Sequence, residues 1–339
     1  MREKKLGITV LAIVLVALFA FVACDGNKVN VANNGEVRFA TGIRKATANS
    51  EWEAADSVGI FMADADDTLS YTDAATSTPD PERYNKQYRA DTAAQTSGFT
   101  AIDAANTLKW DDITTTPKFD FIAYYPYVAT ITTPAALPIS VAAPSAEQVT
   151  GTADFLWGRT DDIENNQSVV ALLLNHKLSR LVVIAKPGVE LGVNDLDSAL
   201  TVHVTGLNTT ATLDLNDGTL TPIVSVADIQ MKDITTQADL DAHQRRYEVV
   251  VIPTAQVTAF ANVGLRFTDV TASNTTYLWK ASESVAEVDE TKIHFDEGKQ
   301  HVYNITLNKA NDEVAVAEIN IEIGDWEDGD GGNWGAVLN

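Results

Sequence analysis

The spacing of apolar residues constrains the fold of this chain most, because it repeats every two positions in almost every periodic segment. Such alternation is typical of half-buried β-strands, whereas an amphipathic helix repeats about every 3.6 residues. Val, Ile, Thr, Tyr and Phe dominate these segments, as expected on a pleated surface. The predicted strands are Val37 to Ile43, Ser57 to Met62, Lys118 to Tyr127, Ser168 to Leu174, Arg180 to Lys186, Leu200 to Gly206, Thr210 to Leu215, Arg246 to Ile252, Asn262 to Asp269, Thr275 to Ala281, His301 to Asn308 and Glu313 to Trp326.

Turn residues separate these predicted strands at short intervals. Asn216-Asp217-Gly218 and Asp296-Glu297-Gly298 are typical of tight turns between neighbouring strands. No window of the sequence shows a long amphipathic helix. The fold class is therefore predicted to be all-β, built from antiparallel β-sandwiches.

The N-terminus reads as a lipoprotein export signal. Arg2, Lys4 and Lys5 precede an uncharged, largely apolar run from Leu6 to Ala23, and the chain's only cysteine, Cys24, follows at once. Phe21-Val22-Ala23-Cys24 resembles a lipobox with Phe where Leu is commoner, so residues 1–23 are predicted to be removed and Cys24 to be lipidated. The alternative is a retained membrane anchor, because an apolar helix of this length comes close to spanning the roughly 30 Å bilayer core.

Charge and cysteine content exclude several classes of protein. The formal net charge of −23 repels phosphate backbones and anionic headgroups, which argues against nucleic-acid binding and leaves the acyl chains on Cys24 to provide membrane attachment. With its single cysteine used for lipidation, the chain has no thiol for a disulfide, a thiolate metal site or a nucleophile. The remaining residues suffice for two domains, at about 100 to 200 residues per domain.

Polar segments suggest where the chain divides. The Pro-, Ser-, Thr- and Asp-rich stretches 72–91 and 132–152 are predicted to be long surface loops. The polar run 161–167 precedes an apolar strand, so a domain boundary is placed there. The expected organisation is a linker at 24–35, an N-terminal β-sandwich at 36–167 and a C-terminal β-sandwich at 168–339.

Candidates for catalytic, cofactor or metal chemistry are weak. The five histidines show no metal-binding spacing, and His176, between apolar strands, is interpreted as a hydrogen-bonded structural residue. A solvated acidic turn is favoured over a calcium site for Asp325, Glu327, Asp328 and Asp330. Core packing is favoured over a sugar-stacking platform for Trp52, Trp110, Trp157, Trp279 and Trp326. We therefore expect no catalytic residue, no cofactor and no metal.

Several motifs, in order along the chain, resemble those of the fimbrillin family. They are Trp52-Glu53-Ala54-Ala55-Asp56-Ser57-Val58-Gly59-Ile60-Phe61, the aromatic strand Phe119-Asp120-Phe121-Ile122-Ala123-Tyr124-Tyr125-Pro126-Tyr127, Asp154-Phe155-Leu156-Trp157-Gly158, Asn175-His176-Lys177-Leu178-Ser179, Gly298 to Leu307 and Ile323-Gly324-Asp325-Trp326. No single motif is specific to this family. The ordered set of motifs, following a lipoprotein signal, is specific to it.

The resemblance implies a subunit of the type V pili of Bacteroides-like bacteria, with two transthyretin-like sandwiches. In that family the subunit reaches the outer membrane as a lipoprotein, and a trypsin-like protease cuts after an Arg and removes the first strand. A donor segment from a neighbouring subunit then fills the groove, with side chains entering alternate pockets.

In this sequence the removable strand would be Glu36 to Ile43, with Val37, Phe39 and Thr41 on one face. The cut would fall at Arg44-Lys45, because the other basic residue, Arg38, lies inside the strand. The alternative is that Arg44 is an ordinary solvated charge in a turn.

The segment Glu313 to Ile323 is the candidate donor, because Ile319, Ile321 and Ile323 lie on one wholly apolar face. The alternative is that this strand pairs within the sheet of its own domain. The tail 331–339 carries three glycines with Trp334, Val337 and Leu338, which fits an insertion completed only in the assembled state.

Two function classes follow. The first is a structural pilus subunit of the outer membrane and cell surface, with other pilus subunits as partners and an adhesion receptor on a host or bacterial cell. The second is a stand-alone surface lipoprotein that binds glycans through exposed aromatic residues.

Overall fold

The computed structural model describes the chain between residues 35 and 325 with gaps. The described residues are 35–43, 52–54, 56–64, 83–94, 96–110, 118–143, 146–164, 169–188, 196, 200–254, 263–269, 275–280, 295–310 and 313–325. For residues 41–43, 269, 275–280, 308–310 and 313–325 the description covers the backbone alone. Among all these residues, no helix combines the length and the apolar character that crossing a bilayer requires.

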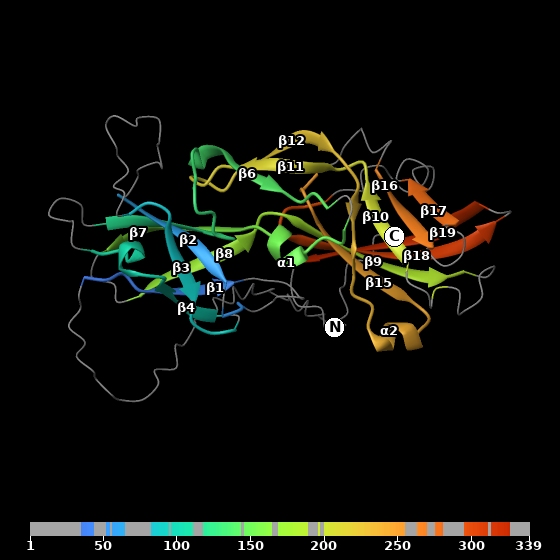
Figure 1. Ribbon diagram of the computed structural model, residues 1–339, viewed down its shortest axis with the longest axis horizontal. Coiled ribbons are helices and arrows are strands. Elements are labelled where there is room, and N and C mark those ends of the chain that lie inside the picture. Colours follow the sequence, from blue (N-terminus) through green and yellow to red (C-terminus); the bar gives the residue numbers. More distant parts are fainter. Residues whose placement is uncertain are drawn as a thin grey trace, which may run out of the picture. The chain divides into compact units, whose positions relative to one another are not determined.

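The described chain is nearly all strand, which confirms the all-β prediction (Figure 1). Its helices are single turns, namely η1 (Ala104–Asn106), η2 (Pro134–Ala136), α1 (Thr150–Ala153) and α2 (Gln237–Asp241). Each strand predicted from alternation has a counterpart in the structure. The predicted loops 72–91 and 132–152 are wrong in part, because they contain strands β3 (Lys86–Ala90) and β6 (Leu137–Ser140).

Seven strands form a closed barrel. In spatial order they are β1 (Phe39–Ile43), β4 (Thr96–Ala101), β3, β2 (Ser57–Asp64), β5 (Lys118–Tyr125), β7 (Leu156–Glu164) and β8 (Val170–His176). Residues that alternate along these strands fill the barrel with one apolar core, which contains Phe39, Ile60, Phe99, Phe121 and Leu172.

The other strands form two sheets. The larger has nine strands in the order β13 (Ile229–Gln230), β10 (Leu200–Thr205), β16 (Gly264–Asp269), β17 (Thr275–Lys280), β19 (Glu313–Asp325), β18 (Lys299–Ala310), β9 (Ser179–Pro187), β15 (Arg245–Val251) and β14 (Lys232–Asp233). The smaller has the order β12 (Leu220–Val226), β11 (Asn208–Leu213) and β6. Both sheets contribute to a second apolar core.

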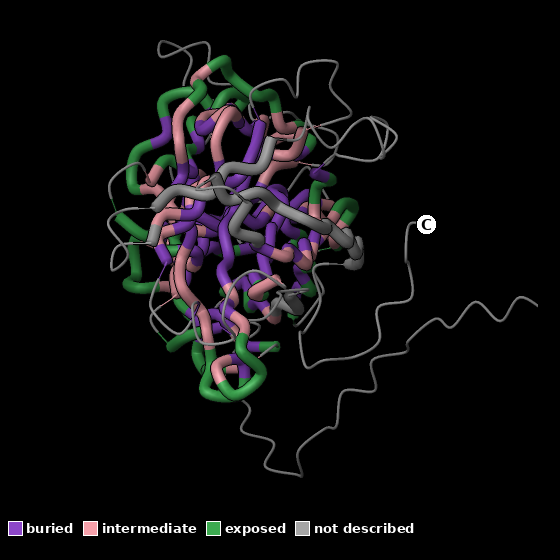
Figure 2. The backbone as a smooth tube through the Cα atoms, turned by 90° about the vertical axis from the view of Figure 1, so that its right-hand side faces the viewer, coloured by how far each residue is buried: buried purple, intermediate pink, exposed green. Residues whose placement is uncertain are grey.

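Strands β2 and β5 belong to both cores. Ile60 of β2 and Phe121 of β5 pack inside the barrel, whereas Phe61 and Tyr124 on the opposite faces of the same strands pack in the second core. β5 is therefore buried on both faces, which explains its near-continuous run of apolar residues. In Figure 2 the buried residues gather in the interior of the described chain.

One short segment joins the two edges of the nine-stranded sheet. β13 pairs with β10 at one edge and β14 pairs with β15 at the other, and only Met231 separates β13 from β14. The sheet therefore curls until its edges approach. Because of this curvature, the sheet encloses the second core from two sides.

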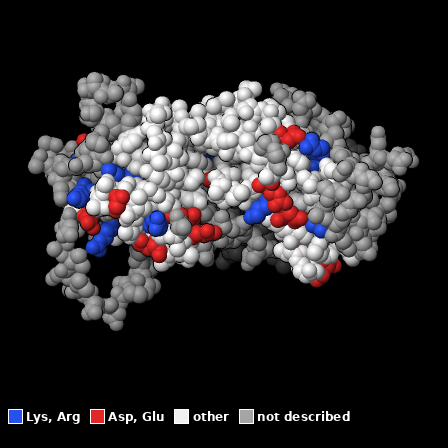
Figure 3. Space-filling view, in the orientation of Figure 1, with Lys and Arg blue, Asp and Glu red and all other residues white. Residues whose placement is uncertain are grey.

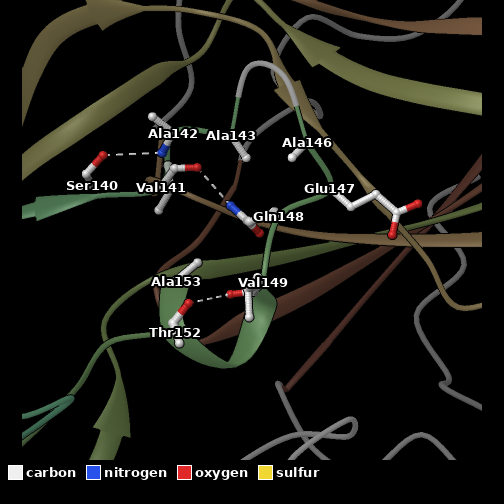
Figure 4. Close-up of a pocket in the computed structure, with 10 residues that line it drawn as sticks. All are labelled: Ser140, Val141, Ala142, Ala143, Ala146, Glu147, Gln148, Val149, Thr152 and Ala153. Atoms are coloured by element: carbon white, nitrogen blue, oxygen red, sulfur yellow. Dashed lines mark hydrogen bonds between the residues drawn. The ribbon is translucent and has the colours of Figure 1, made fainter.

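Gln148 fastens the curled sheet at this point. Its backbone N–H donates to the Gln230 carbonyl of β13 at 3.0 Å, and its side-chain Oε1 accepts from the Val250 N–H of β15 at 2.7 Å. Its Nε2 donates to the carbonyls of Val141 and Val250, both at 2.9 Å. Figure 4 shows the bond to Val141. Beside it, the Thr150 hydroxyl donates to Glu248 Oε1 at 2.8 Å. The buried amide of Gln148 takes the place of a neighbouring strand for Val250.

Among the described residues, three strand pairings cross the expected domain boundary at residue 167. β8 lies after the boundary and completes the barrel beside β1 and β7. β6 lies before it and pairs with β11. The division into independent domains at 36–167 and 168–339, and their transthyretin-like character, stay predictions.

The fastening by Gln148 can be tested by removing its amide. We expect Gln148→Ala to lower the free energy of unfolding by roughly 3 kcal/mol, because buried backbone groups of Val141 and Val250 lose their partners. The control is Gln237→Ala, which removes an exposed amide bonded to Asp241 and should change stability by less than about 0.5 kcal/mol. Urea unfolding followed by tryptophan fluorescence measures both variants. Equal stability of the two variants would contradict the fastening role.

Candidate functional site

Strand β1 closes the barrel. Phe39 to Gly42 pair antiparallel with β4, opposite Phe99 to Thr96, and Phe39 to Ile43 pair parallel with β8, opposite Val170 to Leu174. β1 thus satisfies the backbone groups of both neighbours (Figure 1). Without it, β4 and β8 would each present an unpaired edge.

The side chains at the start of this strand alternate between core and solvent. Val37 and Phe39 are each 3% exposed, whereas Glu36 and Arg38 are exposed. Val37 and Phe39 therefore share one face, as predicted, and that face is buried. The side chain of Thr41, the third residue of that face, lies outside the description.

Phe39 occupies an aromatic pocket. Its ring meets Tyr88 edge-on at a centroid distance of 5.0 Å and Phe121 edge-on at 5.5 Å. Trp110 packs against the same group of rings, with its ring centroid 5.7 Å from that of Phe121 and 5.9 Å from that of Phe119. Edge-to-face contacts of this kind add stabilisation beyond the area they bury.

Backbone hydrogen bonds hold the chain that leads into β1. The Val37 N–H donates to the Leu108 carbonyl at 2.9 Å, and the Trp110 N–H donates to the Gly35 carbonyl at 2.6 Å. The Leu108 N–H in turn donates to the Tyr88 hydroxyl at 2.8 Å. Burial raises the pKa of this hydroxyl, which therefore stays protonated. Tyr88, which lines the pocket of Phe39, thus also positions the loop that holds Val37.

Sequence reasoning missed Tyr88, because it assigned residues 72–91 to a loop. β3 has the sequence Lys-Gln-Tyr-Arg-Ala, in which only Tyr88 and Ala90 point inward and are buried. Two apolar residues among polar ones are a weak strand signal. The available signal for this strand was Tyr88, an aromatic residue at an alternating position.

The predicted cleavage residues Arg44 and Lys45 lie outside the described residues, as do Cys24 and the tail 331–339. The chain is described again at Trp52, which is fully buried and meets Phe99 at 4.9 Å and Tyr125 at 5.6 Å. Residues 44–51 therefore connect two anchored parts of the barrel. Cleavage at Arg44 stays a prediction.

The predicted donor segment lies in β19, inside the nine-stranded sheet. It pairs with β18 along most of its length and with β17 at Val314. Its three isoleucines stand opposite buried residues of β18, with Ile319 opposite Ile305, Ile321 opposite Tyr303 and Ile323 opposite His301. This is the place that the alternative interpretation gave to the strand. A donor role for these isoleucines stays a prediction.

His176 is a structural residue, as predicted. It is 4% exposed, and its Nδ1 lies 2.9 Å from Asp154 Oδ1, which is also buried. Among the residues that the structure describes, no group of three His, Cys, Asp or Glu side chains could hold a metal ion.

The aromatic residues do not form a surface platform in the described part of the chain. Trp52 and Trp110 are buried, as predicted. Every aromatic residue whose side chain is described is buried or half-buried. Trp157 is half-buried and donates to the Leu215 carbonyl at 2.9 Å. The side chains of Trp279 and Trp326 lie outside the description.

A hollow of about 420 Å³ beside Gln148 offers little to a ligand. Small side chains such as Ala142, Ala143 and Ala153 line it, and Figure 4 shows the Glu147 carboxylate turned away from it. On the face shown in Figure 3, described basic residues lie beside acidic ones, so this face carries no continuous basic patch. β1 and its surroundings are therefore the best-defined candidate site.

The contribution of the aromatic pocket can be measured in the uncut chain. We expect Phe39→Ala to lower the free energy of unfolding by about 3–5 kcal/mol, because a buried ring is lost and its neighbours collapse only in part. Arg38→Ala is the matched control on the exposed face and should cost less than about 0.5 kcal/mol. Urea unfolding gives both values. A loss below about 1 kcal/mol for Phe39→Ala would show that β1 does not anchor the barrel.

This chain is similar to known proteins in both sequence and structure. The sequence model of the fimbrillin-like family matches residues 45–326. "Putative fimbrium subunit Fim1C" of Bacteroides uniformis is 25% identical over 317 residues, which cover 91% of each chain.

Two crystal structures share the fold. One is a "putative cell adhesion protein" from Bacteroides uniformis, with a TM-score of 0.63 and 23% identity, covering 87% of this chain and 99% of that chain. The other, also described as a "putative cell adhesion protein", comes from Bacteroides ovatus, with a TM-score of 0.58 and 16% identity, covering 86% and 97% of the two chains. Since the family match extends over most of the sequence, the chain belongs to the fimbrillin-like family.

Proposed function

We propose that this protein is a structural subunit of a type V pilus that contributes to cell adhesion. It is exported as a lipoprotein acylated at Cys24, cut after Arg44 and assembled by strand exchange. The observation that carries the proposal is the position of β1, which completes the barrel and immediately precedes Arg44. Membership of the fimbrillin-like family supports the same role.

A cut after Arg44 would break the covalent link between β1 and the strands that follow it, so that only non-covalent contacts would hold β1 in the barrel. All partners that hold it lie beyond the cut, namely β4, β8 and the loop with Leu108 and Trp110. Losing β1 leaves the ladders of β4 and β8 open and empties the pocket of Phe39. An extended segment from another subunit would satisfy both by adding a strand whose side chains enter alternate pockets.

The extent of the family match supports the same division. It begins at residue 45, so β1 and everything before it lie outside the part of the chain that the family model covers. The barrel without β1, together with the second core, would be the assembled subunit. Strands β2 and β5 would keep the two cores joined.

The donor is proposed to come from the C-terminal part of a neighbouring subunit. The candidates are the face of Ile319, Ile321 and Ile323 and the tail 331–339. Because β19 pairs with β18 over most of its length, releasing Ile319 to Ile323 would require breaking that ladder. The tail 331–339 follows β19 in the sequence and lies outside the described residues.

The lipid on Cys24 would hold the precursor at the outer membrane before assembly, and the fimbrium at the cell surface would be its destination. Partners would be other pilus subunits and an adhesion receptor. No observation on the described residues favours the alternative of a glycan-binding lipoprotein, because every described aromatic side chain is buried or half-buried. No catalytic role is proposed.

Limited trypsin digestion of the purified chain from residue 24 tests the exchange mechanism. We expect a cut at Arg44 or Lys45, retention of a compact core and conversion of the nicked protein into oligomers, because open strand edges pair with other chains. Size-exclusion chromatography with N-terminal sequencing measures the outcome. The control is Arg44→Gln with Lys45→Gln, which should resist this cut and stay monomeric. A nicked protein that remains monomeric at high concentration would count against strand exchange.

A further inference from the structure

Strand β12 presents a free edge and apolar side chains to solvent. Among the described strands, β12 pairs with β11 alone, and it is the longest of those that have one side unpaired. Ile223, Val224 and Val226 belong to its exposed residues, and Val224 is 89% exposed. Apolar side chains gathered in this way at a strand edge mark a contact surface.

The three-stranded sheet that ends in β12 carries no charge. The sequences of β6, β11 and β12 contain only Leu, Ile, Val, Ala, Pro, Ser, Thr and Asn. Figure 3 shows an uncharged surface where Figure 1 places these strands. The chain as a whole has a net charge of −23. Two copies repel each other where acidic surfaces come within about 10 Å, the screening length at 0.1 M salt, so a neutral sheet is where they can approach.

The charged residues nearest to β12 along the chain favour an antiparallel pair of copies. Asp217 lies in the turn before the strand, and Asp228 follows the strand and accepts from Arg266 at 2.8 Å. In an antiparallel pair, each Asp217 lies at the end where the other copy has the ion pair of Asp228 and Arg266. A parallel pair would place Asp217 opposite Asp217, and like charges repel.

Two features limit how far the free edge can pair. Pro222 has no N–H to donate to a neighbouring strand. The register between β11 and β12 shifts at Thr209, whose hydroxyl donates to the Ser225 carbonyl at 2.8 Å. Prolines and bulges restrict edge pairing in this way. The edge therefore suits a short contact held largely by side chains rather than a continuous ladder.

We propose that the edge of β12 is a self-complementary contact through which a second copy of this chain associates laterally, with the two β12 strands antiparallel about a two-fold axis. The inference rests on the proposed function, because the two copies would belong to neighbouring pili. A strand of this length spans about 23 Å, so the contact buries well below the roughly 1,200 Å² of a stable pair. Isolated chains therefore stay monomeric, whereas filaments that repeat the contact associate through avidity.

Vesicles that display many copies test the contact without requiring pilus assembly. The uncut chain from residue 24, purified without acylation, is coupled through its only cysteine, Cys24, to maleimide lipids in phosphatidylcholine vesicles. Dynamic light scattering measures clustering of these vesicles, alone and mixed with bare vesicles. We expect the coated vesicles to cluster with each other, while the same chain in solution elutes as a monomer from a size-exclusion column.

Variants of β12 should reduce clustering without changing the fold. Val224→Glu should lower it at least about tenfold, because the two-fold axis brings two added carboxylates together. Val224→Thr, which keeps the shape of the side chain, should lower it by a smaller factor. The control is Ile102→Glu, which adds the same charge at an exposed apolar residue outside this sheet and should cluster like the unchanged chain. Equal urea midpoints verify the fold, and Val224→Thr decides if the glutamate variant folds poorly.

Salt and mixed vesicles identify the occupant. Raising NaCl from about 0.05 M to about 0.5 M should increase clustering, because it screens the repulsion between acidic surfaces. Vesicles carrying Val224→Glu should join clusters of unchanged vesicles poorly, because each contact uses β12 of both copies.

Four results would overturn the proposal. They are coated vesicles that stay apart, β12 variants that cluster as well as the control, clustering that falls with salt, and clusters that recruit bare vesicles, which would make lipid the occupant. Val224→Glu vesicles that join unchanged ones freely would show that another face of the copy is the partner. None of these results bears on strand exchange, because the uncut chain keeps β1. A failure of the trypsin experiment would in turn remove the pilus but leave the vesicle result standing.

Discussion

A single five-residue strand closes the barrel of this protein, and the proposed function depends on how that strand is held. β1 is antiparallel to β4 and parallel to β8, and the Phe39 ring packs inside the barrel against Tyr88 and Phe121. A closed barrel has no exposed strand edges, whereas the same barrel without one strand has two. β1 is therefore held by pairing on both sides and by one aromatic anchor.

The second core is held by contacts that do not include β1. Strands β2 and β5 place one face in the barrel core and the other in the second core. Gln148 fastens the opposite side of the second core by bridging β13 and β15. The packing of β2 and β5 in the second core and the hydrogen bonds of Gln148 do not involve β1. Under the proposed exchange, the groove would open beside a core that keeps these contacts.

The sequence predicted what local alternation encodes and missed what depends on distant contacts. Strands rich in Val, Ile and Tyr were predicted because each turns a regular apolar face to a core. β3 was missed because Tyr88 and Ala90 alone face inward among polar residues. The role of Gln148 could not be predicted, since its partner Val250 lies 102 residues away along the chain. Phe39 was placed correctly on the same face as Val37, but its pocket is assembled from β3 and β5 and is visible only in the fold.

The N-terminal residue of the subunit recovered from assembled pili tests the central claim most directly, because it reports whether β1 is still attached. Edman sequencing or mass spectrometry of that material gives the answer. The account predicts Lys45 as the first residue, with acylated Cys24 found only in the unassembled precursor. Assembled subunits that begin at Cys24 would retain β1 in their own barrel, and that result would contradict assembly by strand exchange at this groove.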